Sequence, residues 1–138
     1  MDQGNAILIV EDNADIREVF RTLFELEGFD VHVAENGEDA LHRLDDDHIE
    51  PFLILLDLSM PVMDGWSFLD VLHRRNDTER FPVTVLSANV DPVQTRELKA
   101  RYGCRVLRKP ASVEALLGIA NACREQGRAQ SPPRGPGQ

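Results

Sequence analysis

Carboxylates follow two of the most apolar stretches of the chain. Glu11 and Asp12 come directly after residues 6–10, Ala-Ile-Leu-Ile-Val, and Asp57 comes directly after residues 52–56, Phe-Leu-Ile-Leu-Leu. A short apolar run bounded by polar residues is typical of a strand that is buried on both faces of a parallel sheet. The carboxyl ends of parallel strands meet at one edge of the sheet, where open α/β folds bind ligands. We therefore expect these carboxylates to lie together.

Two further polar side chains are expected at the same edge. Ser87 ends a third apolar run, residues 83–86, and Lys109 follows a fourth, residues 104–107. Ser87 would add a neutral hydroxyl donor, and Lys109 a fixed positive charge close to the acids.

Carboxylates gathered in this way repel one another. Two of them about 4 Å apart cost roughly 4 kcal/mol at an effective dielectric constant of about 20, so the cluster requires a cation or the protonation of one member. Oxygen ligands suit Mg²⁺, with Mn²⁺ as the second candidate, and the ion would keep several waters. An acidic cluster with a metal, a lysine and a hydroxyl is what phosphoryl transfer requires. In that chemistry the metal and Lys109 neutralise the phosphoryl oxygens, and Asp57 is the nucleophile.

Strand-like and helix-like patterns alternate along the chain. Strands are expected around residues 6–10, 29–33, 52–56, 83–86 and 104–107, and helices around residues 14–27, 37–44, 65–72, 92–102 and 113–120. Five strands interleaved with five helices predict an α/β fold whose parallel sheet is covered on both faces. Length and order match the doubly wound, flavodoxin-like type with strand order 2-1-3-4-5. Strand 29–33 alternates in polarity and is expected at an edge. Helix 92–102 has only three apolar anchors, Val93, Leu98 and Tyr102.

Composition limits the partners and the location of the protein. The chain has 138 residues and a net charge of −9, which argues against nucleic-acid binding because phosphate attraction requires clustered lysine and arginine. No apolar run approaches the roughly 20 residues that span a bilayer, and the N-terminus lacks the basic region of a signal peptide. We expect a cytoplasmic protein that does not bind membranes.

The chain length supports one domain. We expect this domain over residues 1–125, followed by a disordered, Pro/Gly-rich tail over residues 126–138. Cys104 and Cys123 have neither metal-ligand nor redox spacing, and are expected to be small buried groups in a reducing compartment.

The residues at the strand ends also carry a resemblance to a known family. They are Glu11-Asp12, Asp57, Ser87-Ala88 and Lys109-Pro110. In type and spacing they resemble the receiver domain of two-component response regulators, and the whole chain is similar to a single-domain receiver of the chemotaxis-regulator type. The resemblance covers about residues 6–125. Its most specific part is the stretch over residues 56–65, Leu-Asp-Leu-Ser-Met-Pro-Val-Met-Asp-Gly.

The resemblance implies a role for each site residue. Asp57 would be the phosphoacceptor, the Ser87 hydroxyl would bond the phosphoryl group, and Lys109 would pair with it. The implied metal ligands are Asp12 directly, Glu11 largely through water, Asp57, and the backbone carbonyl of Ser59. One position departs from the family pattern, because Val106 stands three residues before the lysine, where the family commonly has an aromatic switch residue.

The resemblance also implies a function. The chain would be a single-domain response regulator that accepts a phosphoryl group from a sensor histidine kinase or a histidine phosphotransfer protein. It would support its own phosphorylation and dephosphorylation without being an enzyme. It would then bind a downstream protein partner or act as a phosphorelay intermediate, as a monomer or as a homodimer formed on phosphorylation.

Three alternatives remain at this point. Aspartyl-phosphate hydrolases resemble one another in having a second carboxylate two residues after the nucleophile, which acts as the general acid. This chain has Ser59 at that position, and a serine cannot serve as that acid. A flavodoxin would bind phosphate in the first strand–helix loop, and here Glu11 and Asp12 would repel it. A degenerate receiver would serve only as a protein-binding module, although all the site residues are intact, and a phosphorylation assay separates this case from the main interpretation.

Overall fold

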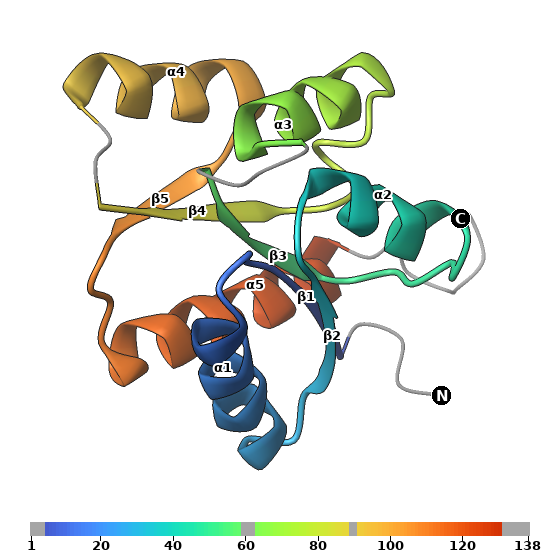
Figure 1. Ribbon diagram of the computed structural model, residues 1–138, viewed down its shortest axis with the longest axis vertical. Coiled ribbons are helices and arrows are strands. Elements are labelled where there is room, and N and C mark those ends of the chain that lie inside the picture. The colour runs from blue at the N-terminus through green and yellow to red at the C-terminus, as the bar shows by residue number, and fades with distance from the viewer. Residues whose placement is uncertain (1–4, 59–62, 89–90, 131–138) are drawn as a thin grey trace.

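The structure, a computed structural model, describes residues 5–58, 63–88 and 91–130. Within them a five-stranded parallel sheet in the order β2-β1-β3-β4-β5 is interleaved with five helices (Figure 1). The strands are β1 Ala6–Val10, β2 Asp30–Ala34, β3 Leu53–Asp57, β4 Val83–Ser87 and β5 Arg105–Arg108. The helices are α1 Ala14–Leu26, α2 Gly37–Asp45, α3 Gly65–Arg74, α4 Pro92–Tyr102 and α5 Val113–Gln130. The predicted α/β class and strand order are confirmed, and β2 lies at an edge.

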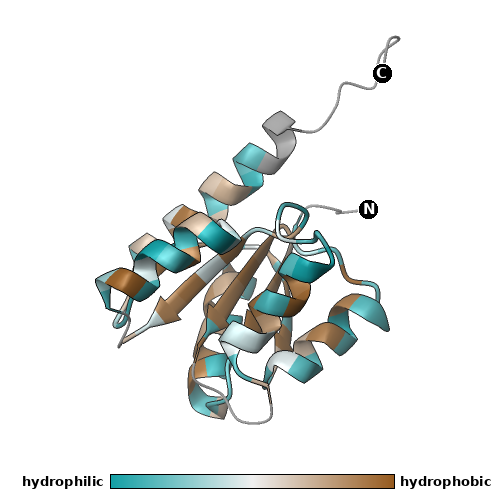
Figure 2. Ribbon diagram, turned by 90° about the horizontal axis from the view of Figure 1, so that it is seen from above, coloured by the Kyte–Doolittle hydropathy of each residue, from teal (hydrophilic) through white to brown (hydrophobic). Residues whose placement is uncertain are grey.

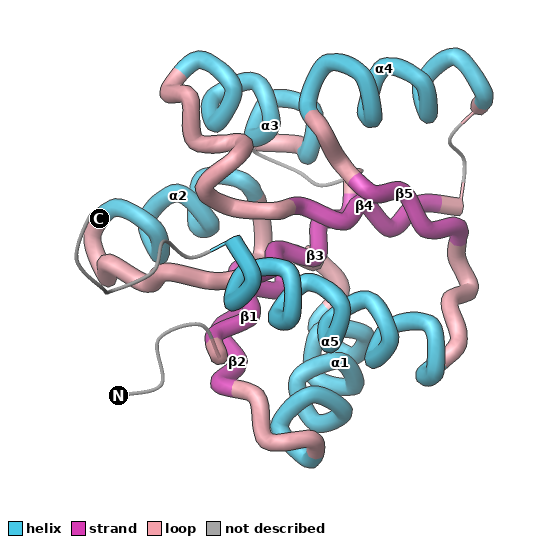
Figure 3. The backbone as a smooth tube through the Cα atoms, turned by 180° about the vertical axis from the view of Figure 1, so that it is seen from behind, coloured by secondary structure: helices cyan, strands magenta, loops and turns pink. Residues whose placement is uncertain are grey.

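The helices cover both faces of the sheet. Helices α1 and α5 lie on one face, and α2, α3 and α4 on the other (Figures 1 and 3). Along β1, Leu8 belongs to the core on the α2–α4 face and Ile9 to the core on the α1–α5 face. Because both faces of the inner strands are covered by helices, these strands are mostly apolar (Figure 2), which explains the apolar runs in the sequence.

Four helices begin with an asparagine or aspartate cap at the carboxyl edge of the sheet. The caps are Asn13 for α1, Asn36 for α2, Asp64 for α3 and Asp91 for α4, and each side chain accepts a hydrogen bond from a backbone N–H in the first turn. Such a cap contributes about 1 kcal/mol and fixes the point at which the loop enters the helix. The loops at this edge are therefore anchored at their helical ends.

Helix α4 is weakly anchored, as its sequence predicts. Leu98 and Tyr102 are buried under it, whereas Val93, which we expected to be a third apolar anchor, is 66% exposed. An element held by few buried contacts is one that opens or shifts readily.

Some boundaries differ from the sequence-based prediction. Strands β2, β3 and β5 each begin and end one residue later than expected, which is within the usual uncertainty of element ends. Helix α5 continues to Gln130, so residues 126–130 are helical where we expected a disordered tail to begin. This segment consists mostly of good helix formers, and the helix ends just before the Ser-Pro pair that disfavours it. Residues 131–138 lie outside the described part.

Neither α5 nor any other helix in the described ranges is both long and apolar enough to cross a membrane. Cys104 and Cys123 are both buried and form no disulfide, as expected for small core residues. Burial raises the pKa of the Cys104 thiol to about 12, which leaves almost none of the reactive thiolate at neutral pH.

A buried hydroxyl in β4 provides a test of the core. Thr84 is fully buried, and its Oγ1 has no hydrogen-bond partner among the described residues. Leaving such a group unsatisfied costs about 1–3 kcal/mol. Because valine has nearly the same shape, we expect Thr84→Val to raise the free energy of unfolding by about 1 kcal/mol in urea denaturation.

The control for this prediction is Thr95→Val. The Thr95 hydroxyl donates to the Asp91 carbonyl oxygen at 2.9 Å, so this variant should gain nothing. A Thr84→Val protein less stable than the wild type would contradict the prediction.

Candidate functional site

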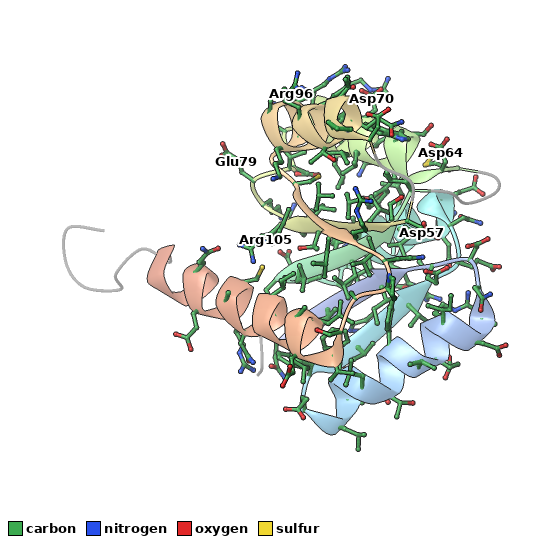
Figure 4. The ribbon with its side chains drawn as sticks, turned by 90° about the vertical axis from the view of Figure 1, so that its left-hand side faces the viewer. Asp57, Asp64, Asp70, Glu79, Arg96 and Arg105 are labelled. Atoms are coloured by element: carbon green, nitrogen blue, oxygen red, sulfur yellow. The ribbon has the colours of Figure 1, made fainter. Side chains whose placement is uncertain are left out.

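The sheet brings the predicted acids together. Val10 and Leu56 are partners in neighbouring strands, so the residues that follow them leave the same edge side by side. One ligand oxygen from each of Glu11, Asp12 and Asp57 lies within 4.8 Å of the other two. In Figure 4, Asp57 and Asp64 are on one side of the view, and Arg105, at the start of β5, is on the other. The predicted convergence of the carboxylates is confirmed.

Glu11 is the most deeply placed acid of the site, with 3% of its surface exposed. Its Oε2 accepts a hydrogen bond from the Asn13 backbone N–H at 3.2 Å. Its backbone carbonyl oxygen accepts one from Arg17 Nη1 at 2.8 Å. Arg17 thus holds the end of β1 from α1, a contact that our reading of the sequence missed because helical spacing says nothing about the partner of a polar side chain.

Lys109 directly follows β5 and reaches the acids from the same edge of the sheet. Its Nζ lies 3.4 Å from Glu11 Oε1 and 3.7 Å from Asp57 Oδ2, and its side chain is 27% exposed. The Lys109 backbone N–H donates to the Ser87 carbonyl oxygen at 3.1 Å, and the Lys109-Pro110 peptide bond is cis. The two distances place the ammonium next to both the Glu11 and the Asp57 carboxylates, where it supplies a counter-charge.

One ammonium does not cancel the charge of the cluster. Burial, and then the negative charge of Asp57, raise the pKa of the Glu11 carboxyl above its ordinary value, although Asn13 and Lys109 act in the opposite direction. The repulsion is therefore still felt by the buried acid. A group whose pKa is raised by folding lowers the stability of the folded state as the pH rises through that pKa.

Two glycines lie against the described residues on either side of the loop that follows Asp57. A Cβ on Gly65 would lie 2.7 Å from Leu58 Cα and 2.8 Å from the Asp57 carbonyl oxygen. A Cβ on Gly37 would lie 2.9 Å from the Met63 carbonyl oxygen, to which Gly37 also donates its N–H. The sequence marks Gly37 only as a helix start, so its contact with this loop was not predicted. Ser59, the predicted carbonyl ligand, lies outside the described residues.

Ser87 ends β4 next to the acids. Asp57 is in register with Leu86, and Ser87 is in register with Arg108 of β5. The Ser87 side chain is half-buried. Its position at the strand end agrees with the sequence, while its proposed bond to a phosphoryl group stays a prediction.

The donor set fits a hard divalent cation. Within the described ranges, Glu11, Asp12 and Asp57 are the one group of three potential metal ligands, and all of them offer carboxylate oxygen. Asp12 is exposed, so an ion bound there would keep part of its water shell, as Mg²⁺ usually does. The described residues are compatible with Mg²⁺ at this edge of the sheet.

Comparison with protein families agrees with this geometry. The model of the response regulator receiver domain matches residues 7–121, which include the acids, Ser87 and Lys109. The chain belongs to this family. It is thus a receiver domain of the two-component type, and the predicted resemblance is confirmed.

Curated relatives of this receiver domain are longer proteins. Regulatory protein AtoC of Escherichia coli K12 is 42% identical over 99 residues, which cover 72% of this chain and 20% of that protein. Transcriptional regulatory protein CpxR of the same strain is 38% identical over 96 residues, covering 70% of this chain and 40% of CpxR. The probable transcriptional regulator ycf27 of Pyropia yezoensis is 30% identical, and the match covers 88% of this chain and 55% of that protein. The receiver domain spans about half or less of these relatives.

Solved structures of similar size share the fold. The receiver domain of a Francisella response regulator is 29% identical, has a TM-score of 0.79, and the match covers 89% of this chain and 98% of that one. Chemotaxis protein CheY4 of Vibrio cholerae is 26% identical with a TM-score of 0.75, and the match covers 86% of this chain and 97% of that one.

Charge crowding at the edge of the sheet predicts an unusual stability change. Asp57→Asn removes one of the charges that raise the Glu11 pKa, and it keeps the shape of the side chain. At pH 7.5 in EDTA we expect this variant to be more stable by about 1 kcal/mol, measured as a rise in the thermal unfolding midpoint. The gain should shrink in Mg²⁺, because the ion relieves the same repulsion.

Asp64→Asn is the matched control for this comparison. Asp64 caps α3 by accepting from the Ser67 N–H at 2.9 Å, and asparagine caps equally well. The control should therefore change little in either buffer. A clear drop in the midpoint of Asp57→Asn in EDTA would rule out the proposed crowding.

Proposed function

We propose that Asp57 accepts a phosphoryl group from a phosphohistidine of a sensor histidine kinase or histidine phosphotransfer protein. The observation that carries the proposal is the position of Lys109, whose ammonium lies within 3.7 Å of both Asp57 and Glu11. A cation placed between a nucleophilic carboxylate and a neighbouring acid is suited to hold an incoming dianion that the acids alone would repel.

In the proposed transfer, an oxygen of Asp57 forms a bond to phosphorus on the side opposite the donor. The phosphorus–nitrogen bond to the donor imidazole breaks, and its electron pair stays on the ring nitrogen, which takes up a proton from solvent. Lys109 then pairs with a phosphoryl oxygen, and the Ser87 hydroxyl donates to another. Glu11, Asp12 and Asp57 would hold Mg²⁺, which supplies further neutralisation of the phosphoryl charge when it is bound.

The protein would act as a switch and not as an enzyme with an external substrate. The phosphoryl group adds negative charge at Asp57, beside the end of β4, and we propose that it shifts helix α4, the element that follows β4 in the chain. We propose that the output passes to a protein partner, or onward in a phosphorelay, and that the exchange takes place in the cytoplasm. A net charge of −9 supports a protein partner over a nucleic acid.

Labelling by a small phosphodonor tests the proposal. Wild-type protein with Mg²⁺ and acetyl phosphate should gain one phosphoryl group, seen as a single mass increment in intact-protein mass spectrometry. Asp57→Asn should gain none, since an amide is not a nucleophile here. Asp64→Asn should be labelled to the same extent as the wild type. Asparagine still caps α3, and the charge that is lost does not belong to the cluster of Glu11, Asp12 and Asp57.

Two outcomes would defeat the assignment. Stoichiometric labelling of Asp57→Asn at another residue would move the acceptor elsewhere. No labelling of the wild type, either by acetyl phosphate or by a phosphorylated kinase, would favour a receiver used only as a protein-binding module.

A further inference from the structure

A cavity of about 190 Å³ lies beside the phosphoacceptor site, between β4, β5 and α4. It is lined by Ser87, Thr95, Val106 and Arg108, and it is partly open to solvent. One water takes up about 30 Å³ in the liquid, so the space has room for several waters or for the end of a long side chain. It meets the described site at Ser87 and includes none of the carboxylates.

Alternation along β5 decides which side chains face this cavity. Val106 packs with the core on the α2–α4 face, whereas Leu107 packs with the core on the α1–α5 face. Arg108 therefore points to the same face as Val106, toward α4. The short side chain of Val106 leaves the space open, and the next residue on that face is an arginine.

Arg108 is free to respond to a change in the site. It is exposed, and within the described residues its side chain has no hydrogen bond or ion pair. By contrast, Arg101 on α4 pairs with Glu97 at 3.2 Å. A guanidinium has only donors, so it requires oxygen acceptors.

The two hydroxyls of the cavity wall provide such acceptors. Thr95 Oγ1 gives its single proton to the Asp91 carbonyl oxygen at 2.9 Å, so its lone pairs remain for accepting. A Ser87 hydroxyl that donates its proton to a phosphoryl oxygen can still accept a hydrogen bond at its own oxygen. A donor-only group in the cavity then completes a chain of hydrogen bonds that ends on the phosphoryl group.

The strand register brings Arg108 close enough to take part. Asp57 on β3 is in register with Leu86, and Ser87 on β4 with Arg108. Neighbouring strands are about 4.8 Å apart, so the Cα atoms of Asp57 and Arg108 are about 10 Å apart. An extended arginine side chain with one hydroxyl between covers that distance.

We propose that Arg108 is a positioning residue for the phosphorylated state. Its guanidinium enters the cavity and donates to the oxygens of Ser87 and Thr95 when Ser87 donates to the phosphoryl group on Asp57. The inference rests on the proposed phosphorylation of Asp57. The added negative charge of the phosphoryl group attracts the Arg108 guanidinium into the cavity beside α4. There its hydrogen bonds link Ser87 at the end of β4 to Thr95 on α4.

Beryllofluoride, which mimics a phosphoryl group on aspartate, is the probe for this proposal. Its affinity in excess Mg²⁺ is measured by fluorine NMR for the wild type, Arg108→Gln, Arg108→Lys and Arg105→Gln. We expect Arg108→Gln to weaken binding about threefold to tenfold, as for the loss of a partly exposed charged contact. Arg108→Lys should recover part of the lost affinity. Added salt should reduce the difference in beryllofluoride affinity between the wild type and Arg108→Gln, because salt screens charge interactions.

Arg105→Gln is the matched control. Arg105 is an exposed arginine on the same strand, but it lies at the opposite end of the sheet from Asp57 (Figure 4). It should bind beryllofluoride like the wild type. An equal loss of beryllofluoride affinity in Arg105→Gln would show that the effect comes from the overall charge of the protein. Affinity in Arg108→Lys no higher than in Arg108→Gln would show that it comes from packing. Either result overturns the proposal.

A double variant tests the location. Val106→Phe places a ring in the cavity, so Arg108→Gln should cost nothing further in that background. An undiminished cost there would overturn the proposal. Wild-type protein that fails to bind beryllofluoride would count against phosphorylation of Asp57 itself, whereas normal binding by both wild type and Arg108→Gln would count against the Arg108 inference alone.

Discussion

Glu11, Asp12 and Asp57 are held within 4.8 Å of one another, with the Lys109 ammonium beside them. Left in solution, such side chains would separate, because like charges repel and nothing in an unfolded chain brings residues 11 and 57 together. The fold holds them because they lie at the ends of neighbouring buried strands, whose apolar packing outweighs the repulsion. The site therefore stores unfavourable electrostatic energy that a cation or a phosphoryl group with its counter-ions can release.

The surrounding structure keeps this arrangement rigid on one side and loose on the other. On the side of β1 and β3, Arg17 holds the Glu11 carbonyl and Gly65 lets α3 pack directly on the Asp57 backbone. On the side of β4 and β5, α4 has only Leu98 and Tyr102 buried beneath it, and a cavity adjoins Ser87. A change in charge at Asp57 is thus expected to move the α4 side, since it has fewer buried contacts and an adjoining cavity.

The fold and the position of most site residues could be predicted from the sequence. Apolar runs of five residues predict buried strands, and the parallel order forces their polar ends to one edge, so the meeting of Glu11, Asp12, Asp57 and Lys109 followed from pattern alone. Contacts between residues in separate elements could not be predicted. The hydrogen bonds from Arg17 to the Glu11 carbonyl oxygen and from Gly37 to the Met63 carbonyl oxygen depend on three-dimensional positions that sequence spacing does not encode. The exposure of Val93 was missed because helical periodicity shows which residues share a face and not whether that face is covered. The helical residues 126–130 were missed because the Pro/Gly-rich composition that follows them was extended too far upstream.

Direct binding of magnesium tests the central claim, that the crowded acids form a cation site. Isothermal titration calorimetry of the wild type at pH 7.5, alongside Asp12→Asn, Glu11→Gln and Asp64→Asn, separates the cluster from its surroundings. The account predicts one weakly bound Mg²⁺ in the wild type and in Asp64→Asn. It also predicts a larger loss of affinity for Asp12→Asn than for Glu11→Gln, because exposed Asp12 is predicted to bind the ion directly and Glu11 largely through water. No Mg²⁺ binding by the wild type, or an equal loss in Asp64→Asn, would contradict it.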